Sequence, residues 1–201
     1  MRQKTPRRPS TSGLAGLLAV CAVFFLAGDA PGAEPRIVSA SAPRTVSLFI
    51  PNHRQLARNW CWAAVAQQLL ARRFDVEIPF QCELAGRAKG VSTQACCLGA
   101  LACRGTASLT ELAALLRREG AATRRLPSLD PLDLQAELAR GRAVVVGLRE
   151  AARPRHLVVV KGIDWIAGEA WLRINDPEGL RPSLIRHRDL ARIAEAALSV
   201  D

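Results

Sequence analysis

A cysteine stands between two tryptophans in the stretch NWCW, residues 59–62, and its thiol is the first candidate for chemistry in this sequence. A thiol becomes a strong nucleophile when its thiolate is stabilised, which the N-terminus of a helix or a nearby imidazolium can do. Cys61 lies in the first turn of a predicted helix, so we expect the first condition to hold. The alternative is a buried, unreactive thiol, since free cysteines are commonly buried.

The imidazolium must come from one of only three histidines, which are His53, His156 and His187. His156 begins the most regular predicted strand, HLVVVKGI, from which its ring could face Cys61. His53 lies shortly before the Cys61 helix, and His187 lies among arginines in RHRD. We therefore expect His156 to be the partner of the thiol, with a structural histidine at a strand end as the alternative.

A third group is needed to hold the imidazole in one tautomer. The strand that begins at His156 and the strand over residues 170–175 are joined by DWIAGE. Antiparallel pairing about a centre near Ile166 would place His156 opposite residue 176 or 177. Asp176, or the adjacent Asn175, is then within reach of the ring. A register change of one residue exchanges the two faces of a strand, so both candidates stay open.

An acyl-transfer site also needs hydrogen-bond donors for the oxyanion that develops on the attacked carbonyl. The backbone N–H of Cys61 is one candidate. The side-chain amide of Gln55, which precedes the helix in QLARNWCW, is the other. A plain surface glutamine is the alternative reading of Gln55.

The other cysteines suggest cross-links. Cys21 lies in an apolar N-terminal run, and four more lie in QCELAGRAKGVSTQACCLGALAC: Cys82, Cys96, Cys97 and Cys103. Because adjacent cysteines rarely pair with each other, we expect Cys96 and Cys97 each to bond Cys82 or Cys103, which leaves Cys61 free. A zinc site is the rival, but these spacings are not typical of zinc ligands. The sequence implies no cofactor and no metal.

The N-terminal residues have the layout of a secretory signal peptide. Basic residues precede an uncharged apolar run, LAGLLAVCAVFFLA, and small residues follow it. That run is shorter than the roughly 20 residues needed to span a bilayer. We expect a signal peptide over residues 1–33, a linker over 34–44 and one domain over 45–201. The protein is then exported, periplasmic or secreted, without a stable membrane span after signal removal, where disulfides persist.

The charge balance bears on partners. The chain has 28 Lys and Arg residues against 18 Asp and Glu, a formal net charge of +10. The arginines are scattered and form no stripe with aromatic side chains, which argues against nucleic-acid binding. We expect a protein or peptide as the partner and a monomer as the state.

Hydrophobic patterns place helices first and strands second. We expect helices over residues 59–73, 108–120 and 130–141 and from Asp189 onward, and strands over residues 46–50, 143–148, 156–163 and 170–175. The first helix is apolar nearly all round and should be buried, with Asn59 as its N-cap and Trp60 and Trp62 in the core. A disulfide-rich loop follows it. This order predicts an α+β domain in two lobes.

Taken in order, the motifs Q-x5-C-W, H-L-V-V-V-x-G-I and a strand ending in N-D-P resemble those of a papain-like cysteine peptidase. The similarity is greatest to short bacterial forms, namely bacteriocin-processing double-glycine peptidase domains and papain-fold avirulence effector proteases. These share the C-W-A-A start and the closing D-P. The resemblance implies a helical lobe with a buried nucleophile helix and an antiparallel β lobe.

The resemblance also implies a role for each candidate residue. Cys61 would be the nucleophile, His156 the general base and later acid, and Gln55 part of the oxyanion hole. Asp176 would orient the imidazole, with Asn175 as the alternative, because papain uses an asparagine there. The implied function is a secreted cysteine endopeptidase. A transglutaminase-like acyltransferase on the same triad and a non-catalytic, disulfide-stapled binding or toxin-like domain are the alternatives.

Overall fold

The computed structural model describes residues 42–72, 77–150 and 153–201, and this part of the chain is helical first and mainly β afterwards. The helices are α1 (Cys61–Leu70), α2 (Gln81–Lys89), α3 (Thr93–Cys97), the 3-10 turn η1 (Leu101–Cys103), α4 (Leu109–Arg118), α5 (Pro131–Ala139) and α6 (His187–Ala191). The strands are β1 (Val46–Ser47), β2 (Thr123–Leu126), β3 (Ala143–Glu150), β4 (Arg153–Ile166), β5 (Glu169–Asn175), β6 (Leu184–Arg186) and β7 (Ala194–Val200). The predicted signal peptide and most of the predicted linker lie outside the described residues.

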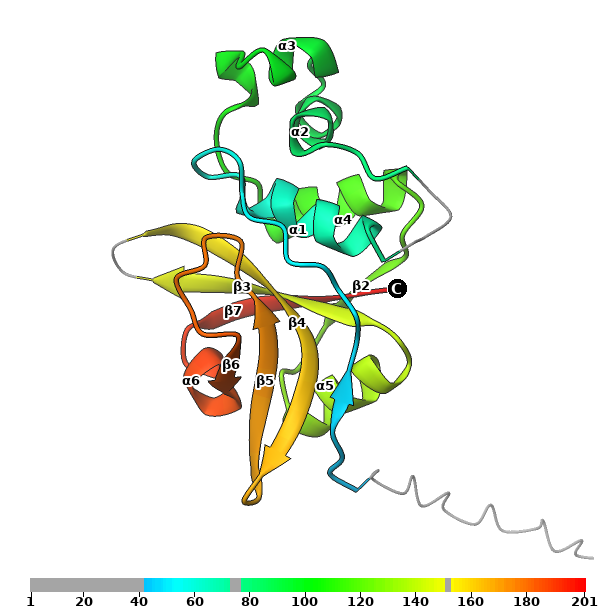
Figure 1. Cartoon of the computed structure of the whole chain (residues 1–201), viewed down its shortest axis with the longest axis vertical. Coiled ribbons are helices and arrows are strands. Elements are labelled where there is room, and N and C mark those ends of the chain that lie inside the picture. The colour runs from blue at the N-terminus through cyan, green and yellow to red at the C-terminus, as the bar shows by residue number, and fades with distance from the viewer. Residues whose placement is uncertain (1–41, 73–76, 151–152) are drawn as a thin grey trace, which may run out of the picture. The chain divides into compact units, whose positions relative to one another are not determined.

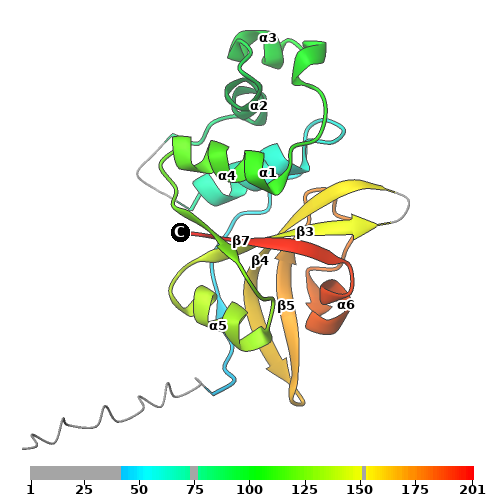
Figure 2. The same ribbon diagram turned by 180° about the vertical axis from the view of Figure 1, so that it is seen from behind.

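The strands form one antiparallel sheet in the order β2-β7-β3-β4-β5-β6, and β1 pairs with β4. Alternate residues of each strand face opposite sides, so the sheet has a hydrophobic core on each face. Val145 and Val159 point to the core shared with α1, α2 and α4, and Val146 and Val160 point to the core shared with α5 and α6. Figures 1 and 2 show α1 and α4 next to the sheet, with α2 on their far side. The predicted α+β class is confirmed.

Burial rather than capping stabilises α1. Every residue of this helix is buried, as its apolar composition predicts. The prediction that Asn59 caps it is wrong. Trp60 occupies the N-cap position without a side-chain hydrogen bond, and Asn59 lies in the left-handed region with φ of 66°. The helix therefore begins at Cys61, whose backbone is in its first turn.

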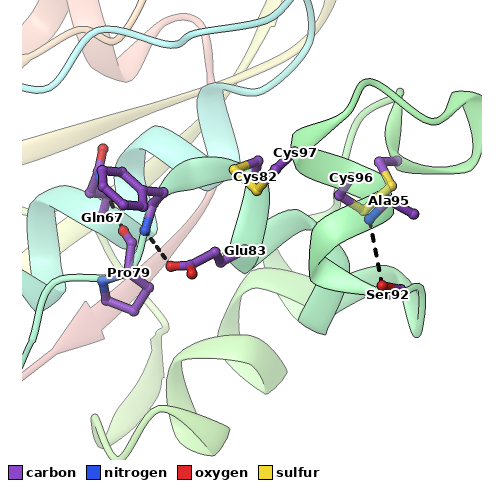
Figure 3. Close-up of a disulfide and its surroundings, with 10 residues drawn as sticks. Gln67, Pro79, Cys82, Glu83, Ser92, Ala95, Cys96 and Cys97 are labelled. Atoms are coloured by element: carbon purple, nitrogen blue, oxygen red, sulfur yellow. Dashed lines mark hydrogen bonds between the residues drawn. A yellow bond between two sulfur atoms is a disulfide. The ribbon is translucent and has the colours of Figure 1, made fainter.

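The expected disulfide-rich loop is largely helical, since it contains α2, α3 and η1. The hydroxyl of Ser92 caps α3 by accepting a hydrogen bond from the backbone N–H of Ala95, as Figure 3 shows. Helices this short are marginal alone, so their packing and cross-links must stabilise them. The cysteines indicated cross-links, but they carried no signal for the backbone conformation between them.

The C-terminal end also differs from expectation. The predicted final helix is only α6, and β7 follows it and pairs with both β2 and β3. The stretch AEAALSV is rich in helix formers, but pairing on both sides of the strand overrides that local preference. The strands β2 and β6 were not predicted either. Within the described residues, no helix is both long and apolar enough to cross a membrane.

A bulge in β4 decides which residues share a face with His156. Ile163 pairs with Leu172 but Val160 pairs with Ile174, so the register shifts between Val160 and Gly162. By alternation beyond the bulge, His156 and Asp176 lie on the same face, and Asn175 lies on the other.

The turn of this hairpin also differs from expectation. Ile166 pairs with Glu169 across a two-residue turn, Ala167 and Gly168, with φ of 49° and 80°. Positive φ at both central residues is typical of the primed turns that suit the twist of paired strands. The centre predicted near Ile166 is therefore wrong. His156 consequently meets Asp176 diagonally rather than directly across the strand pair.

Candidate active site

The start of α1 and the N-terminal part of β4 bring Cys61 and His156 together. The Cys61 thiol lies close enough to the His156 imidazole to act on its pKa, and Nε2 of His156 lies 2.7 Å from Oδ1 of Asp176. All three are buried, with exposed fractions of 3%, 4% and 4% for Cys61, His156 and Asp176. An imidazole held between a thiol and a carboxylate is the arrangement that favours thiolate formation.

The charges of this cluster follow from its contacts. Burial disfavours an imidazolium, but the hydrogen bonds to Asp176 and Cys61 outweigh it and raise the pKa of His156 to about 9. Burial also opposes ionisation of Asp176. The hydrogen bond and charge of His156 nevertheless hold the pKa of that carboxyl well below its usual range. At neutral pH the pair is an imidazolium beside a carboxylate.

Residues of the loop after β5 hold the Asp176 carboxylate. The backbone N–H of Glu178 donates to Oδ1 at 2.9 Å, and the backbone N–H of Arg181 donates to Oδ2 at 3.2 Å. The Arg181 guanidinium adds an ion pair with Oδ2 at 3.1 Å. Sequence reasoning missed Arg181, although an arginine shortly after the Asp-Pro turn was a usable signal for a carboxylate partner.

Asn175 does not face the imidazole. Its amide Nδ2 donates to the carbonyls of Ile50 and Pro51 at 3.1 and 3.2 Å, and its side chain is buried. It therefore ties the segment before α1 to the end of β5. Of the two candidates for the third position, the structure brings Asp176 to His156.

Gln55 lies on an irregular segment beside the loop that follows Asp176. Its backbone N–H donates to the carbonyl of Pro177 at 3.0 Å. Its side-chain Oε1 is buried without a hydrogen-bond partner, and its Nε2 donates to none of the described residues. The side-chain amide of Gln55 is thus not used in hydrogen bonds within the described part of the chain.

The tryptophans on either side of Cys61 anchor α1 to the disulfide-bonded segment. The indole N–H of Trp60 donates to the carbonyl of Cys103 at 3.0 Å, and that of Trp62 donates to the carbonyl of Gly105 at 3.1 Å. Both side chains are buried, as predicted. The nucleophile candidate is therefore held from both sides through backbone carbonyls of one short stretch.

The cysteines pair as Cys82–Cys97 and Cys96–Cys103, and Cys61 is free. The prediction of two disulfides within this cluster is confirmed, and the zinc alternative is excluded because these four sulfurs are bonded to one another. Figure 3 shows Cys82, on α2, bonded to Cys97, on α3.

The remaining histidines lie elsewhere. His187 donates a hydrogen bond to the Leu129 carbonyl at 2.6 Å, and the His53 carbonyl accepts from Gln68 at 2.8 Å. The histidine beside the thiol is His156.

A free thiol next to an imidazole and a carboxylate, on helices followed by an antiparallel sheet, defines the class of cysteine proteases. A family model described as the papain-like cysteine protease AvrRpt2 matches residues 45–185, and the chain belongs to this family. The resemblance inferred from the motifs is thereby confirmed. No curated protein matches the chain.

Two solved structures share the fold. The peptidase domain of Streptococcus ComA, a bi-functional ABC transporter involved in a quorum sensing pathway, is 15% identical over 76% of this chain and 97% of its own, with a TM-score of 0.55. A putative C39-like peptidase from Bacillus anthracis is 16% identical over 79% of this chain and 98% of its own, with a TM-score of 0.54. At these identities the likeness is one of fold.

Proposed function

We propose that this protein is an exported cysteine endopeptidase that hydrolyses peptide bonds through an acyl-enzyme. The observation that carries the proposal is the buried cluster in which His156 hydrogen-bonds Asp176 and has the Cys61 thiol beside it. Export is supported by the signal-like N-terminus and by two disulfides, which persist in oxidising compartments.

In this mechanism the Cys61 thiolate attacks the peptide carbonyl carbon and forms a C–S bond. The backbone N–H of Cys61 and the free Gln55 amide donate to the oxyanion. His156 gives its proton to the leaving amine as the C–N bond breaks. A water then attacks the thioester while His156 takes a proton from it, and the acid product leaves as the thiolate re-forms.

Asp176 is assigned the orienting role. Its carboxylate accepts from Nε2 of His156, which leaves Nδ1 to serve the thiol. The ion pair with Arg181 keeps the carboxylate charged and in place. Asn175, the type of residue that papain uses, is assigned to holding the segment before α1 instead.

Iodoacetamide alkylation of the mature, unreduced protein, without the predicted signal peptide and its Cys21, tests the assignment when it is read by peptide mass between pH 4 and 9. We expect Cys61 alone to label and to react rapidly at pH 6, because a neighbouring imidazolium favours the thiolate. His156→Ala should slow the reaction at pH 6 by at least about tenfold, because it removes the cation beside the thiol. His187→Ala, a matched histidine change away from the thiol, should leave the rate unchanged. An equal rate in wild type and His156→Ala would contradict the proposal.

Cleavage of a random peptide library supplies the second readout. We expect new peptide termini with wild type and none with Cys61→Ala. Peptides joined to an added amine, without new carboxyl termini, would overturn hydrolysis in favour of acyl transfer on the same residues. Library turnover that survives in Cys61→Ala would overturn the nucleophile assignment.

A further inference from the structure

The side chain of Gln81, the first residue of α2, hydrogen-bonds the two peptide groups on either side of Gln55, and we call this pair of bonds the Gln81 clamp. Its Oε1 accepts from the backbone N–H of Leu56 at 2.9 Å, and its Nε2 donates to the carbonyl of Arg54 at 2.7 Å. Its exposed fraction is 1%. A single side-chain amide therefore completes both hydrogen bonds that a neighbouring strand would otherwise offer to this part of the backbone.

The same amide is linked to the nucleophile helix. Nε2 of Gln81 also donates to Oε1 of Gln67, which lies on α1, at 3.1 Å. Gln67 in turn donates to the carbonyl of Pro79 at 3.0 Å. The buried side-chain amides of Gln81 and Gln67 thus connect the Gln55 segment to α1, the helix that begins with Cys61.

The Gln55 segment needs such support because it has no regular structure of its own. Residues 48–55 belong to no helix or strand, and Leu56 is 73% exposed. Within the described residues, the Gln55 backbone is fixed by its N–H bond to Pro177 and by the two Gln81 bonds around it. Its side-chain Nε2 donates to no residue that the structure describes, so the placement of the backbone governs where this donor can reach.

We propose that Gln81 is a positioning residue for the oxyanion hole: it fixes the backbone of Gln55 so that the free amide meets the developing oxyanion. The inference rests on the proposed function, in which Gln55 is one of the two oxyanion donors. An oxyanion donor acts on the transition state and must lie within about 0.5 Å of its productive place. Loosening the clamp should therefore lower kcat and leave substrate binding and the thiol unchanged.

Gln81→Leu removes both hydrogen bonds to the Gln55 segment, together with the bond to Gln67, while keeping a similar volume. Gln135→Leu is the matched control, because Gln135 makes the same clamp away from Gln55: its Oε1 accepts from the N–H of Arg44 at 2.7 Å, and its Nε2 donates to the carbonyl of Ala42 at 3.0 Å. Gln135 is also 1% exposed. Gln135→Leu therefore measures the effect of losing a buried glutamine with two such backbone hydrogen bonds at a place away from Gln55.

The readouts are kcat and KM on a peptide that the library identifies, and the pH 6 alkylation rate of Cys61. For Gln81→Leu we expect kcat to fall about 10- to 100-fold, below the 10²- to 10³-fold typical of deleting a donor outright. We expect KM and alkylation to stay within about twofold, since neither depends on the oxyanion. For Gln135→Leu we expect the fold-change in kcat to be no larger than the fold-change in KM.

A double-mutant cycle decides between positioning and general destabilisation. In a Gln55→Ala background, Gln81→Leu should lower kcat by no more than about twofold, because the donor it positions is gone. An equal loss of kcat in both backgrounds would overturn the inference, as would a loss confined to KM or to alkylation. If Gln81→Leu does not fold, Gln81→Glu, which keeps an acceptor for Leu56 but cannot donate to Arg54, is judged by the same cycle.

Failure of the proposed function would look different. In that case Cys61→Ala would retain turnover or His156→Ala would leave alkylation unchanged, whatever Gln81 does. If the Cys61 and His156 variants behave as expected but the effects of Gln81→Leu and Gln55→Ala on kcat are additive, only the role of Gln81 is overturned.

Discussion

The helical region (residues 61–118) and the hairpin β4–β5 each supply part of the site, but they hold their residues by different means. Among the described residues of this helical region, no helix is longer than 10 residues, and side-chain hydrogen bonds and two disulfides join its pieces. The hairpin is held by a backbone hydrogen-bond ladder that one bulge in β4 interrupts. Cys61 comes from the first region, and His156 and Asp176 come from the second or directly follow it.

This difference indicates which substitutions should displace the site residues of each region. In the hairpin, position follows from register, so one bulge determines which carboxylate or amide faces the imidazole. In the helical region, position depends on separate contacts such as the Trp60 indole bond and the Gln81 clamp. Changes there should act locally and should respond to the redox state of the disulfides.

The largest effect should come from the end of the hairpin. Asp176→Asn should lower kcat/KM by about 10²- to 10⁴-fold, because an amide no longer enforces the tautomer or stabilises the imidazolium. Against the effect of burial, Asp176 and Cys61 together raise the pKa of His156 to about 9, so loss of the Asp176 bond should move the alkaline limb of the kcat/KM profile to lower pH. A pH profile of both proteins checks this. A limb that stays near pH 9 would contradict the assignment.

Asn175→Ala is the matched control for that change. It breaks the bonds to Ile50 and Pro51 and should lower the free energy of unfolding by about 1–3 kcal/mol without moving the alkaline limb.

The raised pKa of His156 also makes the stability of the folded protein depend on pH. His156 keeps its proton to about pH 9 in the folded protein but only to about 6.5 when unfolded, so the free energy of unfolding should fall as pH rises through that window. Asp176→Asn should flatten this dependence.

Breaking a cross-link of the helical region should have the next largest effect. The double change Cys96→Ala and Cys103→Ala should lower the free energy of unfolding by about 2–4 kcal/mol. Amide hydrogen exchange should rise mainly in α2 and α3, and kcat should fall because Trp60 loses a fixed acceptor at Cys103. An equal rise of amide hydrogen exchange in β3 and β4 would show that loss of this disulfide does not act on the helical region alone.

The smallest effect should come from the bulge itself. A Cβ on Gly162 would lie 2.8 Å from the carbonyl oxygen of Val46 and 3.2 Å from Cα of Ser47, so Gly162→Ala should displace β1. We expect a loss of about 1–3 kcal/mol in urea unfolding and little change in kcat, because His156 lies beyond the bulge. At Gly147, also in a strand, the nearest atoms are 3.6 Å away, so Gly147→Ala should cost less. Equal losses would contradict the steric explanation.

Much of the chemistry could be predicted from the sequence. Cys61 could be identified because it lies in the first turn of a predicted helix and is left over when the other cysteines pair, and His156 because it begins a β-branched run. These signals are local: residue type, hydrophobic period and position at the start of an element. The helix α1 and the strands β3, β4 and β5 were predicted for the same reason, with ends displaced by a few residues.

Tertiary structure alone decided what depends on partners distant in the chain. The bulge between Val160 and Gly162 put Asp176 rather than Asn175 beside His156, and pairing with β2 and β3 made a strand of AEAALSV. The Gln81 clamp joins residues 25 positions apart through side-chain amides that have no sequence period. The sequence by itself determined which residues can react. Which of them meet was decided by register and by buried hydrogen bonds, because both depend on contacts that no local pattern encodes.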